Sequence, residues 1–239
     1  MCFYSSNSKR ALALAKRYGK KTNIIEMAQE ILDEQYKITA FTHPDCAIIT
    51  QNQNIEIAKW GLIPHWTKTE EEAQKIRKMT LNARSETVFD KSSFRAPILQ
   101  KRCLIPATGF FEFHYADKAV IPYYIHLKNE DIFSFGGMCE IWHNPATNET
   151  LRTFSVLTTT ANELCAKIHN GGKNPYRMPV IIDREHEEIW LDNTLNATDI
   201  AQFFQPFDAD KMAAYPIASD FLKRSPKDAS IIENTEMAA

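Results

Sequence analysis

The sequence predicts an α+β fold in which helices surround a mainly antiparallel β core. Three observations support this prediction. Short runs with strand-like apolar patterning occupy the middle of the chain, and segments with helical spacing precede and separate them. No Pro/Ser-rich linker, internal repeat or low-complexity tract divides the 239 residues, so we expect a single domain spanning residues 1–239.

The N-terminal segment is predicted to be helical. Apolar residues recur at helical spacing from residue 8 to residue 35, and Gly19 interrupts the pattern. Two helices separated at Gly19 are the expected result. The other end of the chain, residues 226–239, is expected to be a frayed tail.

The middle of the chain changes to the patterning of strands. Predicted strands cover residues 47–51, 55–60, 103–105, 110–114, 123–127, 132–136 and 154–159. Predicted helices cover residues 70–79, 85–90, 161–168, 184–191 and 197–204. The threonine cluster at 158–160 is expected to supply the N-cap of the helix at 161–168.

Charge and glycine usage exclude two function classes. The chain has 28 Lys and Arg against 30 Asp and Glu, so bulk electrostatics does not hold it on nucleic acid and any polyanion site must be local. Residues 9–21 and 67–102 are locally basic, and a solvated helix face is the alternative explanation for both. The seven glycines form no GxGxxG or GxxxxGK[ST] motif, so we expect no nucleotide-phosphate cradle.

Cysteine, histidine and hydropathy patterns exclude further classes of protein. The five cysteines lie far apart without a CxxC pair, which disfavours both a disulfide framework and a zinc knuckle. The seven histidines form no HExxH or HxH pattern, and we expect no metal and no cofactor. No run of about 18 apolar residues and no signal-peptide h-region occurs, so we expect a soluble cytoplasmic protein without a membrane span.

Cysteine at position 2 is the most unusual feature of the sequence. Removal of Met1 by an aminopeptidase would leave Cys2 with a free α-amine beside its thiol. An α-amine has an ordinary pKa of about 7.7–8.0 and a cysteine thiol one of about 8.5, so both groups are partly nucleophilic near neutral pH. Such a 1,2-aminothiol forms an imine with an aldehyde and then closes to a thiazolidine. The alternative is an inert cysteine that happens to follow the initiator.

Two segments combine aromatic, polar and basic residues in the first half of the chain. The segment WGLIPHW at 60–66 places two indoles around a Gly/Pro turn. The segment NARSET at 82–87 places Asn82 and Arg84 at an expected helix start. Amide, guanidinium and spare backbone N–H groups at such a position suit an anion.

Two further segments supply candidate acid–base groups. Glu112 is the only carboxylate in RCLIPATGFFEF, and desolvation by the flanking Phe rings would raise its pKa into the range useful for general acid–base work. Its alternative is a strand residue pointing to solvent. His169 precedes RMPV at 177–180 and could shuttle a proton, while Arg177 could hold a phosphate; a lone histidine is otherwise an ordinary helix-end residue.

Taken in order, Met-Cys, WGLIPHW, NARSET, RCLIPATGFFEF and a His ahead of RMPVII resemble the SOS response-associated peptidase family. Its SRAP domain includes bacterial and eukaryotic shields of abasic DNA. The resemblance runs from Cys2 to about Ile182. It implies a β-rich, barrel-like SRAP fold and a Cys2 that attacks the ring-opened aldehyde of an abasic site in single-stranded DNA. The implied product is a stable thiazolidine cross-link that shields the lesion.

The resemblance also implies catalytic roles for four residues. Cys2 would be the covalent nucleophile through both amine and sulfur, and Asn82 would orient the Cys2 amine and the sugar. Glu112 would assist proton transfer, and His169 would assist sugar ring opening and slow reversal. The family usually has this histidine close ahead of Arg-Met-Pro, whereas residues 171–176 intervene here.

The DNA contacts that the resemblance implies do not distinguish one base from another. The resemblance assigns phosphate contacts to Arg84, Arg177 and, as a weaker candidate, Thr158. It assigns wedge or stacking contacts beside the lesion to Trp66 and Phe94, and such stacking tolerates any sequence. Lesion specificity would then come from the aldehyde.

Two other functions remain open at this point. A thiol peptidase or amidase, acting on other chains or only on its own N-terminus, would use Cys2 on an amide with His169 or Glu112 as base. A non-covalent reader of single-stranded or modified DNA would use the same arginines and aromatic residues without chemistry. The expected partner is single-stranded DNA containing abasic sites, bound by a monomer.

Overall fold

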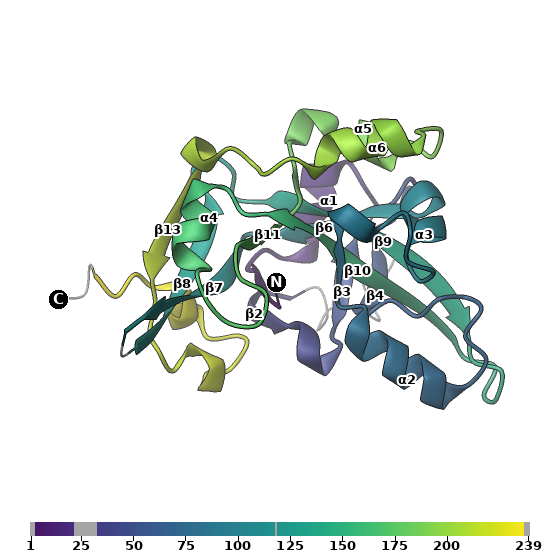
Figure 1. The fold of residues 1–239 in the computed structure, drawn as a ribbon, viewed down its shortest axis with the longest axis horizontal. Helices are drawn as coiled ribbons and strands as arrows, with labels where there is room; N and C mark the ends of the chain where they lie inside the picture. The colour runs from purple at the N-terminus through teal and green to yellow at the C-terminus, as the bar shows by residue number, and fades with distance from the viewer. Residues whose placement is uncertain (1–2, 22–32, 118, 237–239) are drawn as a thin grey trace.

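Two β-sheets with short helices around them make up the structure, a computed structural model that describes residues 3–21, 33–117 and 119–236. Figure 1 shows strands β7, β8 and β13 gathered on one side of the molecule and β9 and β10 extending toward the other. Most strand pairs are antiparallel and the helices are short. This arrangement confirms the predicted α+β fold with a mainly antiparallel core.

The first sheet has the strand order β13-β8-β7-β1-β2, and each neighbouring pair is antiparallel. Its strands are β1 (Tyr4–Asn7), β2 (Gln35–Thr39), β7 (Gly109–Ala116), β8 (Ala119–Leu127) and β13 (Met212–Pro216). Strand β1 pairs with β7 so that Ser5 lies opposite Phe110. The start of the described chain therefore lies beside the strand that carries Glu112.

The second sheet is organised around its two longest strands, β9 and β10. Its strands are β3 (Asp45–Ile48), β4 (Glu56–Trp60), β5 (Asn82–Arg84), β6 (Arg102–Ala107), β9 (Phe133–His143), β10 (Thr150–Thr160), β11 (Arg177–Pro179) and β12 (Ile181–Ile182). Strand β10 pairs in parallel with β4 and β5 and antiparallel with β9 and β11. Thr158 has both Arg84 and Pro179 as register partners, so β10 brings β5 and β11 to the same place.

The second sheet curls without closing into a barrel. In the described chain, its outer strand β3 meets β6 through an isolated bridge in which Ile49 and Leu104 exchange backbone hydrogen bonds of 2.8 and 2.9 Å. No continuous ladder joins the two strands there. The sequence predicts a barrel-like fold, and the structure has a curved sheet that stays open.

Helix α2 (Glu70–Met79) has the bounds predicted from the sequence, and the Thr69 hydroxyl caps it by accepting a hydrogen bond from the Glu72 N–H. Helix α1 (Ala11–Tyr18) ends at Gly19, whose φ of 60° suits glycine. The second predicted N-terminal helix lies mostly outside the described residues. The remaining helices are α3 (Arg95–Gln100), α4 (Glu163–Ile168), α5 (Glu187–Leu191) and α6 (Ala197–Ala201). No helix in the described part of the chain is long and apolar enough to cross a membrane.

Two helix predictions need correction. Residues 85–90 form only a 3₁₀ turn at Ser85–Thr87, because the preceding residues pair with β10 as a strand. Helix α4 is capped by Asn162, which accepts a hydrogen bond from the Cys165 N–H, because the threonine cluster belongs to β10. The 3₁₀ segments are Ala40–Thr42, Ser85–Thr87, Arg184–His186, Gln202–Phe204, Ala209–Lys211, Phe221–Lys223 and Ala229–Ile232.

The described part of the C-terminal segment is packed, whereas the sequence predicts a frayed tail. Ile231 is fully buried in a cluster with Phe111 and Phe221. The Pro226 carbonyl accepts a hydrogen bond of 2.8 Å from the Tyr36 N–H at the start of β2. Apolar burial and backbone pairing thus hold this segment against the first sheet.

The largest apolar cluster joins the two sheets. It combines Phe110 and Ile125 from the first sheet with Phe135 and Phe154 from the second, and all four side chains are fully buried. Because one core is shared, the strands of the first sheet are held in fixed position relative to β10 and its neighbours.

Candidate active site

A cavity of about 480 Å³ lies between the first sheet and the loop that follows α4. It is lined by Phe3, Tyr4, Phe41, Glu112, Phe113, Tyr115, His169, Gly171, Gly172, Lys173 and Asn174. Two residues singled out from the sequence, Glu112 and His169, meet here. Cys2 lies outside the described residues, and Phe3, which follows it in the chain, belongs to the lining.

Glu112 is a buried carboxyl on β7, with only 4% of its surface exposed. Strand alternation directs Phe111 and Phe113 toward the cluster around Phe221 and places Glu112 on the other face, together with Phe110 of the inter-sheet core. The solvent-facing alternative therefore does not apply. Burial raises the pKa of Glu112 to about 8, so at neutral pH the carboxyl is mostly protonated and can act as an acid.

His169 lies at the C-terminal end of α4 with its Nε2 atom 3.7 Å from Oε2 of Glu112. Its Nδ1 is 2.9 Å from the backbone carbonyl of Arg177, so the proton sits on Nδ1 and the lone pair of Nε2 faces Glu112. Burial lowers the pKa of His169, which keeps the ring neutral. The pair thus offers one proton donor and one proton acceptor. The distance between Nε2 and Oε2 is longer than a hydrogen bond, so both side chains can contact the same small group.

Asn82 is the buried amide of β5, 8% exposed, and pairs in register with Val156 of β10. Among the described residues, neither its side-chain oxygen nor its side-chain nitrogen has a hydrogen-bond partner. Leaving such a group unpaired costs about 1–3 kcal/mol. Asn82 is not among the described residues that line the cavity, and its unpaired amide keeps unmet hydrogen-bonding capacity.

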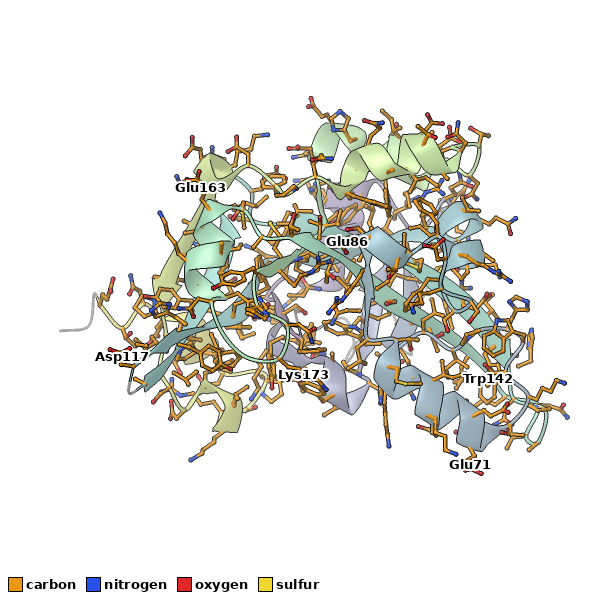
Figure 2. All side chains as sticks on the ribbon, viewed as in Figure 1. Glu71, Glu86, Asp117, Trp142, Glu163 and Lys173 are labelled. Carbon is orange, nitrogen blue, oxygen red and sulfur yellow. The ribbon has the colours of Figure 1, made fainter. Side chains whose placement is uncertain are left out.

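Arg177 and Thr158 are buried and occupied by protein partners. The Arg177 guanidinium forms a two-pronged ion pair with Glu86, one hydrogen bond of which measures 3.0 Å, and donates to the Thr158 carbonyl at 2.8 Å. The Thr158 hydroxyl is fully buried and donates to the Ala83 carbonyl at 3.1 Å. These contacts join the Glu86 turn to β10 and β11 (Figure 2 labels Glu86), and they leave no phosphate-binding fork open in this arrangement.

The other residues expected to contact DNA differ in how exposed their side chains are. Arg84 is exposed, and its guanidinium donates to the side-chain oxygen of Asn174 in the cavity wall. Trp66 is 46% exposed and can offer a ring face. Phe94 is 8% exposed and packed in the second core cluster, so its ring does not offer a face to a base in this conformation. Neither Trp66 nor Phe94 lines the cavity.

Several residues that line the cavity are not predicted as site residues from the sequence. Phe41, Tyr115 and Lys173 line the cavity but lie outside the motifs that carry the resemblance. The signal available for Lys173 was its place in the 171–176 segment, next to His169. Phe41 reaches the cavity from the 3₁₀ turn after β2, and Tyr115 from the strand that carries Glu112; no motif in the sequence marks either of them.

The remaining candidate chemistry is limited. The four cysteines in the described part of the chain, Cys46, Cys103, Cys139 and Cys165, are free and buried, so their thiols do not meet a polymer substrate. Residues 3–21, 33–117 and 119–236 hold no group of three or more His, Cys, Asp or Glu side chains that could bind a metal ion.

Known proteins are similar to this chain in sequence and in fold. The family model described as SOS response associated peptidase (SRAP) matches residues 1–223. The abasic site processing protein YoqW of Bacillus subtilis (strain 168) is 43% identical over 187 residues, which cover 77% of this chain and 78% of that protein. The abasic site processing protein HMCES of Gallus gallus is 30% identical over 182 residues, which cover 67% of this chain and 52% of that protein.

A solved structure agrees with this assignment. The crystal structure of a protein from Bacteroides thetaiotaomicron superposes with a TM-score of 0.95 at 46% identity, covering 98% of this chain and 100% of that one. Sequence, family model and fold point in one direction: the chain belongs to the SOS response associated peptidase (SRAP) family.

Proposed function

We propose that this protein processes abasic sites by joining Cys2 covalently to the ring-opened sugar of an abasic site in single-stranded DNA. The observation that carries the proposal is the neutral acid–base pair of Glu112 and His169 in a cavity that Phe3 lines. Cys2 is one peptide bond from Phe3, and consecutive Cα atoms are about 3.8 Å apart. The names of YoqW and HMCES as abasic site processing proteins support the same function.

The chemistry begins with opening of the sugar ring. Nε2 of His169 accepts the proton of the C1′ hydroxyl while the Glu112 carboxyl donates a proton to the ring oxygen, which leaves C1′ as an aldehyde. The α-amine of Cys2 then adds to C1′, and the resulting carbinolamine loses its hydroxyl as water. The acid that assists this loss is Glu112 after it has regained its proton.

Ring closure completes the link. The Cys2 thiolate adds to the imine carbon and the imine nitrogen takes up a proton, so that a thiazolidine forms. Overall, one aldehyde and one aminothiol give the thiazolidine and one water, with no oxidant or cofactor consumed. The unpaired amide of Asn82 can hold the Cys2 amine and the sugar hydroxyl during these steps.

DNA contacts in this proposal come from the exposed residues. Arg84 holds a phosphate and Trp66 stacks on a base beside the lesion, while the buried Arg177, Thr158 and Phe94 stabilise the frame around the site. Phosphate and stacking contacts read no sequence, so the aldehyde selects the lesion.

The test uses a single-stranded oligonucleotide with one abasic site. Purified protein whose intact mass shows that Cys2 is the first residue should give a heat-stable shifted band on a denaturing gel. Cys2→Ala should give none, whereas Cys46→Ala, which alters a buried cysteine, should retain it. Reduction of the aldehyde with borohydride before mixing should abolish the band.

Two outcomes would contradict the proposal. One is the absence of a band from protein that begins with Cys2, and the other is an equal band from Cys2→Ala. A non-covalent reader would bind intact and abasic strands alike without a heat-stable product. A peptidase restricted to its own N-terminus would lose Met1 without an aminopeptidase, which the intact mass of the chain made in an aminopeptidase-deficient host would reveal.

A further inference from the structure

The loop between α4 and β11 forms one wall of the cavity, and hydrogen bonds hold it on both sides of Lys173. Near its start, the Asn170 side chain accepts a hydrogen bond of 2.8 Å from the Tyr115 N–H and donates one of 3.1 Å to the Tyr115 carbonyl. Further along, Asn174 accepts a hydrogen bond from Arg84. Lys173 lies between these attachments and lines the cavity (Figure 2 labels Lys173).

The loop lies directly on β7. A Cβ atom built on Gly171 would stand 2.6 Å from the Tyr115 ring, so only glycine permits this close approach. Gly172 has a φ of 82°, a conformation that also favours glycine. The close contact with Tyr115 and the hydrogen bonds on both sides of Lys173 together fix the position of the Lys173 backbone in the cavity wall.

Lys173 places a positive charge on the wall of the cavity. It is the only Lys or Arg side chain among the described lining residues. The acid–base pair beside it contributes no charge at neutral pH, because burial raises the pKa of Glu112 and lowers that of His169. No carboxylate of the described chain forms an ion pair with the Lys173 ammonium. A cavity of this kind attracts an anion next to an uncharged reacting group.

We infer that Lys173 is a positioning residue that binds a backbone phosphodiester flanking the abasic sugar while the sugar occupies the cavity. The inference rests on the proposed function. In a DNA strand each sugar is joined directly to phosphodiesters, so a cation on the wall of a cavity that holds the sugar meets a phosphate without base contact. The flexible Lys stem supplies a compact charge that needs no fixed bidentate geometry.

The experiment compares four proteins: wild type, Lys173→Gln, Lys173→Arg and the control Lys75→Gln. Lys75 lies on α2 and pairs with Glu71 at 2.6 Å, and Figure 2 places Glu71 well away from Lys173. The readouts are the second-order rate of heat-stable product with abasic single strands over a range of salt, and the rate of adduct formation with free 2-deoxyribose by intact mass. Free 2-deoxyribose has the aldehyde but no phosphate.

Lys173→Gln should lower the rate with abasic DNA about threefold at low salt, as expected for one exposed ion pair. It should also flatten the plot of log rate against log salt by about 0.7, the value for one phosphate contact with a single strand. Lys173→Arg should restore both quantities, and Lys75→Gln should match wild type. The rate with 2-deoxyribose should be unchanged in all four proteins.

Equal DNA rates for Lys173→Gln and wild type would overturn the inference. An equal loss with 2-deoxyribose would also overturn it, since Lys173 would then maintain the cavity instead of binding phosphate. Failure of wild type to react with either substrate would contradict the proposed function instead. In that case the salt dependence of binding to intact single strands, measured by fluorescence anisotropy, decides whether Lys173 contacts a phosphate.

Discussion

Glu112 couples the stability of the fold to pH. Burial raises its pKa from 4.5 to about 8, so the folded chain retains a proton that the unfolded chain releases. The stability associated with this proton is fully present below about pH 4.5 and is lost as pH rises through about 8. We predict that the free energy of unfolding of the wild type falls between these values, and that Glu112→Gln removes this part of the fall. Urea unfolding of both proteins at several pH values measures this fall. If the free energy of unfolding depends on pH in the same way in both proteins, the prediction is wrong.

The environment of Glu112 also shows how far local sequence predicts a site. The sequence predicts a raised pKa from desolvation by the neighbouring phenylalanines. The structure has the raised pKa, but Phe111 and Phe113 pack against Phe221 on the other face of the strand. Glu112 is buried instead on the face of β7 that it shares with Phe110 of the inter-sheet core, beside the loop that follows α4. Local residues therefore predict the direction of such a shift, while its cause requires the tertiary fold.

At the scale of elements, local signals predicted α2 and failed for the small strands. Helix α2 carries its own cap and acidic first turn, so its bounds follow from its sequence. Strands β5 and β11 have three residues each and exist because both pair with β10. Their partner is distant in the chain, which is why residues 85–90 look helical and why the contact between Arg177 and Glu86 could not be expected.

Lys37 shows how one side chain secures an element. Its ammonium is on β2, 7% exposed, and donates to three backbone carbonyls, those of Phe221 (3.2 Å), Leu222 (2.8 Å) and Arg224 (2.6 Å). Methionine has a similar length but no donor, so Lys37→Met would leave these carbonyls unpaired. We predict a loss of about 2–3 kcal/mol in the free energy of unfolding.

Urea unfolding measures this loss, and Lys75→Met on exposed α2 is the control, with an expected change of less than about 0.5 kcal/mol. Limited proteolysis adds a local readout, because the segment from Phe221 to Ile232 should become the first site of cleavage in Lys37→Met. A stability equal to that of the control would show that the C-terminal segment is held by its apolar contacts alone.

At the scale of the whole molecule, the shared core predicts that both sheets unfold together. Phe135 of β9 is fully buried and packs edge-on against Phe110 of β7, with ring centroids 5.9 Å apart. Phe135→Ala should therefore cost about 3–5 kcal/mol and lower one common midpoint. Trp60 and Trp142 lie on β4 and β9, so their fluorescence follows the second sheet, and hydrogen exchange of peptides from β7 and β8 follows the first. Protection that persists in β7 and β8 beyond the fluorescence midpoint would mean that each sheet is stable alone, and the chain would then consist of two folding units instead of the single domain expected from its sequence.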